Sequence, residues 1–311
     1  MKKFFAFFLI AAALIFGFLW VNGDPRNDGY VAGITDQEEL REKENLIRDN
    51  TEKYQPKFTK KTKEEEINIS AKSAIVVDQE TNEILYAKNI DQKLPPASII
   101  KILTFIIAKE VYQENDLIEI SQHASEQISN KINMKAGEKI RTSDLLYGLM
   151  MISANDAAYA LADFYKDGFD GFVNLANRKV EQLGLKNTKI KNPAGLDDSE
   201  QFSTAFDMAT ITRYALLNHP DIIKYAGKTK EHSVYATDHN EPHWWFGHLS
   251  RMLRVYPYMI AAKTGFTYDA GNTYVGIAEK NNRKIIMVML GSKNTSANED
   301  VKKLLDFGFA N

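Results

Sequence analysis

Ser98 and Lys101 stand three positions apart in Ser98-Ile99-Ile100-Lys101, one residue after the pair Pro95-Pro96. The prolines predict that a helix begins at Ser98 and runs to about Val111. A spacing of three puts both side chains on one helix face. The helix N-terminus favours an anionic nucleophile, and the apolar helix would desolvate the lysine and ease its deprotonation. The pair can serve as nucleophile and base, although Ser-x-x-Lys alone is a weak signal.

Two further motifs place polar side chains at element ends. Ser153-Ala154-Asn155 follows the hydrophobic run Leu145–Ile152, so the end of a helix would present a hydroxyl and an amide together. Lys263-Thr264-Gly265 precedes the last strands, where a cation, a hydroxyl and a glycine let a substrate backbone and carboxylate approach. Each motif alone is weak. Together with the first and in this order, they match the motif set of β-lactamases and penicillin-binding proteins.

From about Ile69 to Phe309, the chain resembles the D-alanyl-D-alanine carboxypeptidases, the low-molecular-weight penicillin-binding proteins of peptidase family S11. Beyond the three motifs, the resemblance is carried by Pro96–Thr104, Asn192–Asp197, Ser203–Ala209, Phe266-Thr267 and Ala270-Gly271.

The resemblance implies a role for each motif residue. Ser98 would attack the terminal D-Ala–D-Ala carbonyl, with Lys101 as the base. Lys263 would keep Lys101 partly neutral by like-charge repulsion. Ser153 would relay a proton to the leaving amine, and Asn155 would orient Lys101 and the substrate amide.

The same resemblance implies how the substrate is held. The backbone N–H groups of Ser98 and Phe266 would form the oxyanion hole. Lys263 and Thr264 would meet the terminal carboxylate, and Gly265 would allow close approach. Water would then hydrolyse the acyl-enzyme without metal or cofactor. The implied partners are the peptidoglycan stem peptide as substrate and β-lactams as covalent inhibitors.

The sequence departs from the family pattern at several points. Phe206 stands where some relatives carry an arginine for the substrate carboxylate, so preference for a carboxypeptidase over an endopeptidase reaction is less defined. Pro257–Ala262 replaces a small-residue turn, and Glu241–Leu253, rich in aromatics, would shape a different cleft rim. We also expect the family's additional β-domain to be missing.

Other functions on the same fold are a β-lactamase and a non-catalytic binding module. A class A β-lactamase needs a glutamate for deacylation, and Lys189–Asp198 offers none. Retention of the motif residues argues against the binding module.

A metal-dependent peptidase is a further alternative. Asp238, His239, His243 and His248 lie close in sequence, and two of the histidines have i,i+4 spacing. Pro242 interrupts any helix there, so loop histidines are the simpler interpretation.

The elements around these motifs predict an α+β fold. Strands are expected at Ala74–Asp78 and Glu83–Ala87, joined as a hairpin, and at Asn272–Glu279 and Lys284–Leu290. Helical patterns dominate from Thr142 to Leu183, and a last helix runs from Ala297 to about Phe309. We therefore predict an antiparallel sheet whose first and last strands pair, flanked by helices with a helical subdomain, as in β-lactamases and transpeptidases.

The N-terminus predicts export. Lys2 and Lys3 precede an uncharged apolar run from Phe4 to Val21, which is near the length that spans a bilayer, and no small-residue cleavage site follows. We predict an uncleaved signal-anchor over residues 1–21, a charged spacer over 22–66 and a catalytic domain over 67–311 on the extracytoplasmic face, or secreted if the signal is cleaved.

Composition excludes several classes of protein. The chain is 44% hydrophobic and 26% charged, which is typical of a globular protein. It has no cysteine, so thiolate zinc sites, disulfides and cysteine nucleophiles are excluded. The net charge of -2 gives no overall basic field for nucleic acid.

Overall fold

The computed structural model describes residues 59–60, 67–227, 231–235, 242–293 and 295–311, with side chains omitted at 59–60, 231–235 and 242–246. The chain divides into two compact units, Met1–Thr35 and Asp36–Asn311. The first unit, which holds the predicted anchor, and most of the predicted spacer lie outside the described residues. Within the described part of the chain, no helix is both long enough and apolar enough to cross a bilayer.

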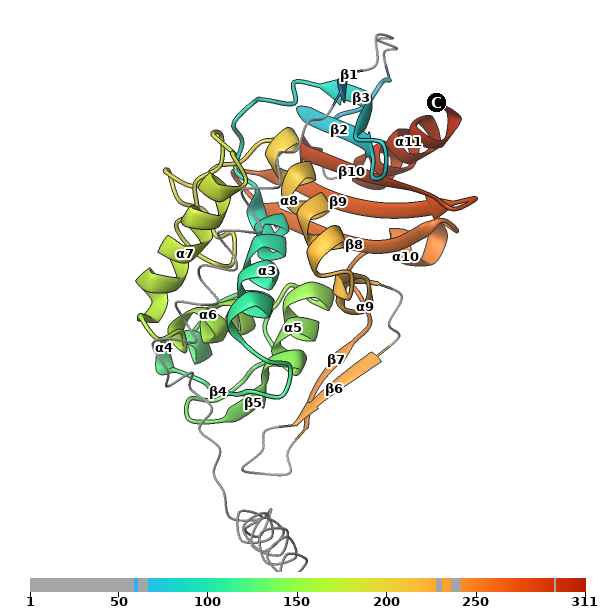
Figure 1. Cartoon of the computed structure of the whole chain (residues 1–311). Coiled ribbons are helices and arrows are strands. Elements are labelled where there is room, and N and C mark those ends of the chain that lie inside the picture. The colour runs from blue at the N-terminus through green and yellow to red at the C-terminus, as the bar shows by residue number, and fades with distance from the viewer. Residues whose placement is uncertain (1–58, 61–66, 228–230, 236–241, 294) are drawn as a thin grey trace, which may run out of the picture. The chain divides into compact units, whose positions relative to one another are not determined.

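A six-stranded sheet organises the domain, in the order β1-β3-β2-β10-β9-β8 (Figure 1). Its strands are β1 (Thr59–Lys60), β2 (Ser73–Asp78), β3 (Glu83–Lys88), β8 (Met259–Thr267), β9 (Gly271–Lys280) and β10 (Arg283–Ser292). β2 pairs with β10 antiparallel, which confirms the predicted pairing of strands from the two ends of the domain. The short β1 was not predicted, and it pairs with β3 in parallel.

Both faces of the central strands are buried, because alternate side chains point to opposite sides of a strand. In β2, Ile75 and Val77 face the larger core, while Ala74 and Val76 face the smaller one. Residues of β10 alternate in the same way between the two cores. The uninterrupted apolar run Ile285–Leu290 therefore matches a strand that is covered on both sides.

Two groups of helices cover the two faces (Figure 1). The larger core packs beneath α8 (Ala205–Asn218) and α3 (Lys101–Val111), and the smaller core beneath α11 (Ala297–Ala310) and α10 (Met252–Val255). α8 begins where the Thr204 hydroxyl accepts a hydrogen bond from the Asp207 N–H, an N-terminal cap that the Thr-x-x-Asp spacing encodes.

A helical subdomain extends from α3 on the side away from α11 (Figure 1). It contains α4 (Gln122–Ser125), α5 (Thr142–Met151), α6 (Asn155–Asp163), α7 (Gly168–Gln182) and the two-stranded sheet of β4 (Leu117–Glu119) and β5 (Lys139–Arg141). Next to it lie α9 (Ile222–Ala226) and the hairpin of β6 (Glu231–Tyr235) and β7 (Pro242–Phe246). The predicted α+β fold with a helical subdomain is confirmed.

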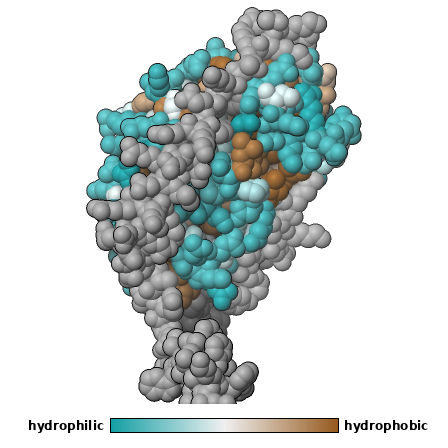
Figure 2. Space-filling model, in the orientation of Figure 1, coloured by the Kyte–Doolittle hydropathy of each residue, from teal (hydrophilic) through white to brown (hydrophobic). Residues whose placement is uncertain are grey.

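The molecular surface is mostly hydrophilic on the face shown in Figure 2, with only small apolar patches. Few large apolar side chains of the described domain are exposed, and two of them, Phe266 and Tyr268, lie at or just after the end of β8.

Candidate functional site

Ser98 lies on a 3-10 turn, Ala97–Ile100 (η1), that leads directly into α3. A helical segment therefore begins close to Ser98, as predicted, but its first turn is a 3-10 turn and the α-helix starts at Lys101. Ala97 has a φ of +48°, a conformation uncommon for a residue with a Cβ. A Cβ on Gly195 would overlap the carbonyl oxygen of Ala97, so this close approach requires glycine. Ser98, the predicted nucleophile, thus lies on a tight turn that is held by a neighbouring loop.

The Lys101 side chain is fully buried at the start of α3 and reaches three oxygen atoms. Its Nζ lies 2.9 Å from Ser98 Oγ, and it donates to Asn155 Oδ1 at 2.7 Å and to the Ala194 carbonyl at 2.6 Å. Burial lowers the pKa of Lys101 well below its usual value, and the positive charge of Lys263 lowers it further, against an opposing effect of Asp156. A neutral amine beside the Ser98 hydroxyl is thereby favoured.

The Ala194 carbonyl is held by a loop built on Asn192. Asn192 Oδ1 accepts from the backbone N–H groups of Ala194, Gly195 and Leu196, and its Nδ2 donates to the Leu196 carbonyl. These four bonds fold residues 192–196 back on themselves. The loop therefore presents a backbone oxygen to Lys101 in a fixed position.

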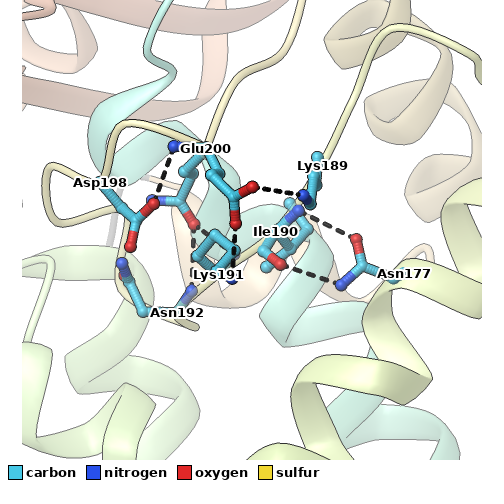
Figure 3. Close-up of polar contacts among 8 residues, drawn as sticks. Asn177, Lys189, Ile190, Lys191, Asn192, Asp198 and Glu200 are labelled. Carbon is cyan, nitrogen blue, oxygen red and sulfur yellow. Dashed lines mark hydrogen bonds and ion pairs between the residues drawn. The ribbon is translucent and has the colours of Figure 1, made fainter.

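The base of this loop is tied to the rest of the domain by further polar contacts (Figure 3). Asn177 of α7 exchanges two hydrogen bonds with the backbone of Ile190, both at 2.9 Å. Glu200 pairs with Lys189 and Lys191 at the surface. The loop is thus anchored at its base by a helix and on its outer side by ion pairs.

Ser153 and Asn155 lie where α5 ends and α6 begins. Ser153 has a φ of +61°, which turns the chain between the two helices. Asn155 donates from Nδ2 to the Ile128 carbonyl at 2.8 Å, so its Oδ1 is directed to Lys101. The next residue, Asp156, is fully buried and accepts from the Ile132 and Asn133 N–H groups. The predicted helix-end turn is present, and a buried carboxylate fixes it.

Strand β8 brings the third motif to the nucleophile. Lys263 is buried and donates to Ser153 Oγ and to the Thr264 carbonyl, each at 2.8 Å. A Cβ added to Gly265 would lie 2.8 Å from the Ser98 nitrogen and would also overlap Thr273 Oγ1. Thr273 donates to the Pro96 carbonyl at 2.9 Å. The glycine therefore allows β8 to contact the Ser98 turn, as its place in the motif predicts.

Burial lowers the pKa of Lys263 to about 7. Lys101 and Lys263 are both fully buried, and the positive charge of Lys263 disfavours the charged form of Lys101. His248 is buried near Lys263; burial first and then the positive charge of Lys263 lower its pKa to about 3. The imidazole is therefore neutral beside the lysine at neutral pH.

The structure brings together Ser98, Lys101, Ser153, Asn155 and Lys263, and it places Thr264, Gly265 and Phe266 on the same strand end. The metal alternative is not supported within the described residues, where no group of three or more histidines and carboxylates could hold an ion. Asp238 and His239, and the side chain of His243, lie outside the described part.

Sequence reasoning missed several residues that complete the site. The Ala194 carbonyl and the Asn192 side chain that fixes it lie within Asn192–Asp197, to which the sequence assigned no chemical role beyond the family resemblance. Ser250 donates its N–H to His248 Nδ1, and its hydroxyl hydrogen-bonds with the Tyr274 hydroxyl. A backbone carbonyl such as that of Ala194 can come from any residue type, so the sequence does not mark it as an acceptor. The signal that could have indicated it is the Asn-Pro-x-Gly turn that begins at Asn192.

Comparison with known proteins agrees with this geometry. The sequence profile of the D-alanyl-D-alanine carboxypeptidase family, peptidase S11, matches residues 59–294. The chain is 33% identical over 251 residues to D-alanyl-D-alanine carboxypeptidase DacF of Bacillus subtilis, covering 79% of this chain and 64% of the relative. It is 30% identical over 247 residues to DacB2 of Mycobacterium tuberculosis, covering 77% of this chain and 82% of that relative. The chain thus spans just under two thirds of the length of DacF.

Solved structures have the same fold. A D-alanyl-D-alanine carboxypeptidase from Mycobacterium tuberculosis superposes with a TM-score of 0.74 at 27% identity, covering 80% of this chain and 95% of that one. The Streptomyces K15 DD-transpeptidase, at 24% identity, has a TM-score of 0.74 over 80% of this chain and all of its own. The motif geometry and these matches together show that the chain belongs to the D-alanyl-D-alanine carboxypeptidase family, peptidase S11.

Proposed function

We propose that the protein is a serine-type D-Ala-D-Ala carboxypeptidase that removes the terminal D-Ala from peptidoglycan stem peptides through an acyl-enzyme on Ser98. The observation that carries this proposal is the coordination of Lys101. A neutral amine has two N–H donors and one lone pair, and Lys101 Nζ has two carbonyl acceptors, Asn155 Oδ1 and Ala194 O, and one hydroxyl, Ser98 Oγ. The lone pair is thus left for the proton of Ser98.

In the first step, Ser98 Oγ attacks the carbonyl carbon of the penultimate D-Ala while its proton passes to Lys101. The resulting ammonium has three N–H donors and the same three oxygen neighbours. Because no neighbour has to change, the site suits both protonation states without reorganisation. The C–N bond to the terminal D-Ala then breaks as the leaving amine takes up a proton.

Lys263 and Ser153 are placed to supply that proton. Lys263 donates to Ser153 Oγ at 2.8 Å, so a proton given by the Ser153 hydroxyl to the leaving amine can be replaced from Lys263. The same ammonium, with Thr264, lies where the terminal carboxylate of the peptide would be bound. The family's oxyanion hole, the N–H groups of Ser98 and Phe266, belongs to this proposal as well.

Deacylation distinguishes this function from that of a β-lactamase. The loop 189–198 that lines the nucleophile carries no glutamate, and Glu200 just beyond it is exposed and paired with Lys189 and Lys191. The loop therefore lacks the glutamate with which class A enzymes activate water against a penicilloyl ester, and its two carboxylates, Asp197 and Asp198, are exposed. We expect β-lactams to leave a lasting adduct on Ser98.

The test is release of D-Ala from a pentapeptide ending in D-Ala–D-Ala, together with covalent labelling by a fluorescent penicillin. Both signals should be present in the unaltered protein and lost in Ser98→Ala. They should be retained in Ser125→Ala, which changes a half-buried serine of α4 whose hydroxyl donates to the Gln122 carbonyl. Fast turnover of penicillin in place of a stable adduct would favour the β-lactamase. Labelling without D-Ala release, but with cleavage of a cross-linked dimer, would favour an endopeptidase. Neither labelling nor release from the folded protein would favour a binding module.

We also propose that residues 1–21 tether the protein to the cytoplasmic membrane, with the catalytic domain on the extracytoplasmic face. The support is the sequence: two lysines followed by an uncharged apolar run from Phe4 to Val21. The test is fractionation of cells that express the full chain or a chain with residues 4–21 replaced. The full chain should sediment with membranes at its uncleaved mass, and an N-terminal sequence that begins after residue 21 would show instead a cleaved signal.

A further inference from the structure

Thr104 continues the helix face that carries Ser98 and Lys101. The three residues are spaced by three positions, and residues with this spacing share one face of a helix. Thr104 is buried, and its hydroxyl donates to the Pro193 carbonyl at 2.6 Å. Lys101 donates to the next carbonyl along the same loop, that of Ala194. One helix face therefore binds two consecutive carbonyls of a single loop.

The Thr104 contact differs from those of two other buried helical threonines. A threonine hydroxyl inside a helix ordinarily donates to a carbonyl of the preceding turn. Thr210 and Thr212 of α8 do so, at 3.1 and 2.7 Å to the carbonyls four residues earlier. Thr104 instead donates out of its helix, to a loop 89 positions further along the chain. Its hydroxyl thus makes a tertiary contact that the helix itself does not require.

The loop holds two consecutive peptide groups at both of their ends. The first, which follows Pro193, has its carbonyl bound by Thr104, and its N–H donates to Asn192 Oδ1 at 3.2 Å. The second, which follows Ala194, has its carbonyl bound by Lys101, and its N–H donates to the same oxygen at 2.8 Å. Each peptide group is planar and turns as one unit. Because the two groups meet at the Cα of Ala194, release of the first carbonyl would also let the second turn away from Lys101.

We propose that Thr104 is a positioning residue for the general base, and that its hydroxyl fixes the orientation in which the Ala194 carbonyl meets Lys101. The inference rests on the proposed function, in which neutral Lys101 uses its two N–H donors on carbonyl oxygens and keeps its lone pair for Ser98. Without the Ala194 acceptor, the amine can turn about its terminal C–N bond, and its lone pair is no longer directed at the Ser98 hydroxyl. Thr104 thus acts on the base through the loop.

The same contact affects the charge of Lys101. An ammonium N–H donates a stronger hydrogen bond than an amine N–H, so the Ala194 carbonyl stabilises the charged form of Lys101 more than the neutral form. Loss of this acceptor should therefore lower the pKa of Lys101 further, and the acidic limb of the acylation rate should move to lower pH. A loss of stability alone would not move that limb.

The test compares Thr104→Val, which removes the hydroxyl but keeps a branched side chain, with Thr104→Ser, which keeps the hydroxyl. The rate constant for labelling of the full-length protein by a fluorescent penicillin is measured from about pH 5 to 10. At its optimum, Thr104→Val should label about tenfold more slowly than the unaltered protein, with its acidic limb at lower pH. Thr104→Ser should label within about threefold of the unaltered protein, with its acidic limb unmoved.

The matched control is Thr212→Val, which removes another buried hydroxyl whose hydrogen bond stays within α8. It should retain the rate and the pH profile of the unaltered protein, and melting temperatures check that each variant is folded. Thr104→Ala, which also lacks the hydroxyl, should behave as Thr104→Val does, and it serves as the test if the valine variant does not fold.

Two results would overturn the positioning role of Thr104. One is an unchanged labelling rate without the hydroxyl, and the other is a lower rate with an unmoved acidic limb, which would leave Thr104 with a structural role alone. Failure of the unaltered protein to be labelled or to release D-Ala would instead overturn the proposed function. The two failures are distinguishable, because the first is measured between variants and the second on the unaltered protein.

Discussion

Gly265→Ala should slow acylation of Ser98 although it leaves every side chain of the proposed mechanism in place. The added methyl group would lie 2.8 Å from the Ser98 nitrogen and would overlap Thr273 Oγ1, whose hydroxyl holds the Pro96 carbonyl. Neither neighbour can move freely, because one is backbone and the other is hydrogen-bonded. The methyl group must therefore push β8 away from the turn that carries the nucleophile.

The size of this displacement sets the expected effect. Ordinary van der Waals contact begins at 3.4 Å, so β8 must shift by about 0.6 Å relative to Ser98. A misplacement of about 1 Å can cost a reaction a factor of about 100. We therefore expect the second-order rate constant for acylation to fall roughly 10- to 100-fold, which corresponds to about 1.4–2.7 kcal/mol of activation free energy.

The assay is the rate of labelling by a fluorescent penicillin, with the melting temperature as a check on folding. The matched control is Gly276→Ala on the neighbouring strand β9, where the three atoms nearest to the new methyl group would be side-chain atoms of Tyr274 and Met259, at 3.2–3.4 Å. The control should label within a few-fold of the unaltered rate. Equal rates for Gly265→Ala and the unaltered protein would refute the claim that contact between β8 and the Ser98 turn positions the nucleophile.

Three further predictions concern charge, the loop and stability. In Lys263→Gln, loss of the nearby positive charge should raise the pKa of Lys101. Because the neutral form of Lys101 is the proposed base, the acidic limb of the acylation rate should shift to higher pH, which a rate profile from about pH 5 to 10 would measure. Asn192→Ala removes the acceptor of three backbone N–H groups, so the Ala194 carbonyl is no longer held in place. Penicillin labelling should slow about tenfold or more, and an unchanged rate would show that the loop is rigid without the Asn192 side chain. Asp156→Ala leaves the backbone N–H groups of Ile132 and Asn133 without their acceptor. The free energy of unfolding should fall by about 2–4 kcal/mol, which thermal unfolding would show as a decrease of roughly 5–10 °C in Tm. A decrease below about 1 °C would contradict this account.

The sheet and the motif positions could be predicted because their signals are local. β2 and β10 are short runs of β-branched and other apolar residues, bounded by turn residues. Their residues are apolar without alternation because both faces of these strands are buried. Ser98 and Lys101 are three residues apart in one segment, so their proximity needs no tertiary information. Lys263 could be placed beside them only through the family resemblance, because it lies 162 positions after Lys101 in the sequence.

The remaining features depend on tertiary contacts that leave no local pattern. The 3-10 turn at Ala97 forms where the Gly195 loop and β8 approach it, while the local sequence after two prolines suits an ordinary helix start. The neutral state of His248 arises from burial beside Lys263, which its neighbours in sequence do not indicate. β1 consists of two residues within a polar, charged segment and has no apolar alternation to mark it.

The pairing of β2 with β10 bears on when this catalytic centre can exist during synthesis. β10 lies between β2 and β9, so it connects β2 and β3, which precede Ser98 in the chain, to β9 and to β8, which carries Lys263. A nascent chain that ends before residue 283 lacks the centre of its sheet, and β8 and β9 then have no connection to β2. Folding must therefore wait for contacts between residues more than 200 positions apart, such as Ile285 with Asp78. Ser98 is made early, but under the proposed function it can become reactive only after nearly the whole chain has been synthesised.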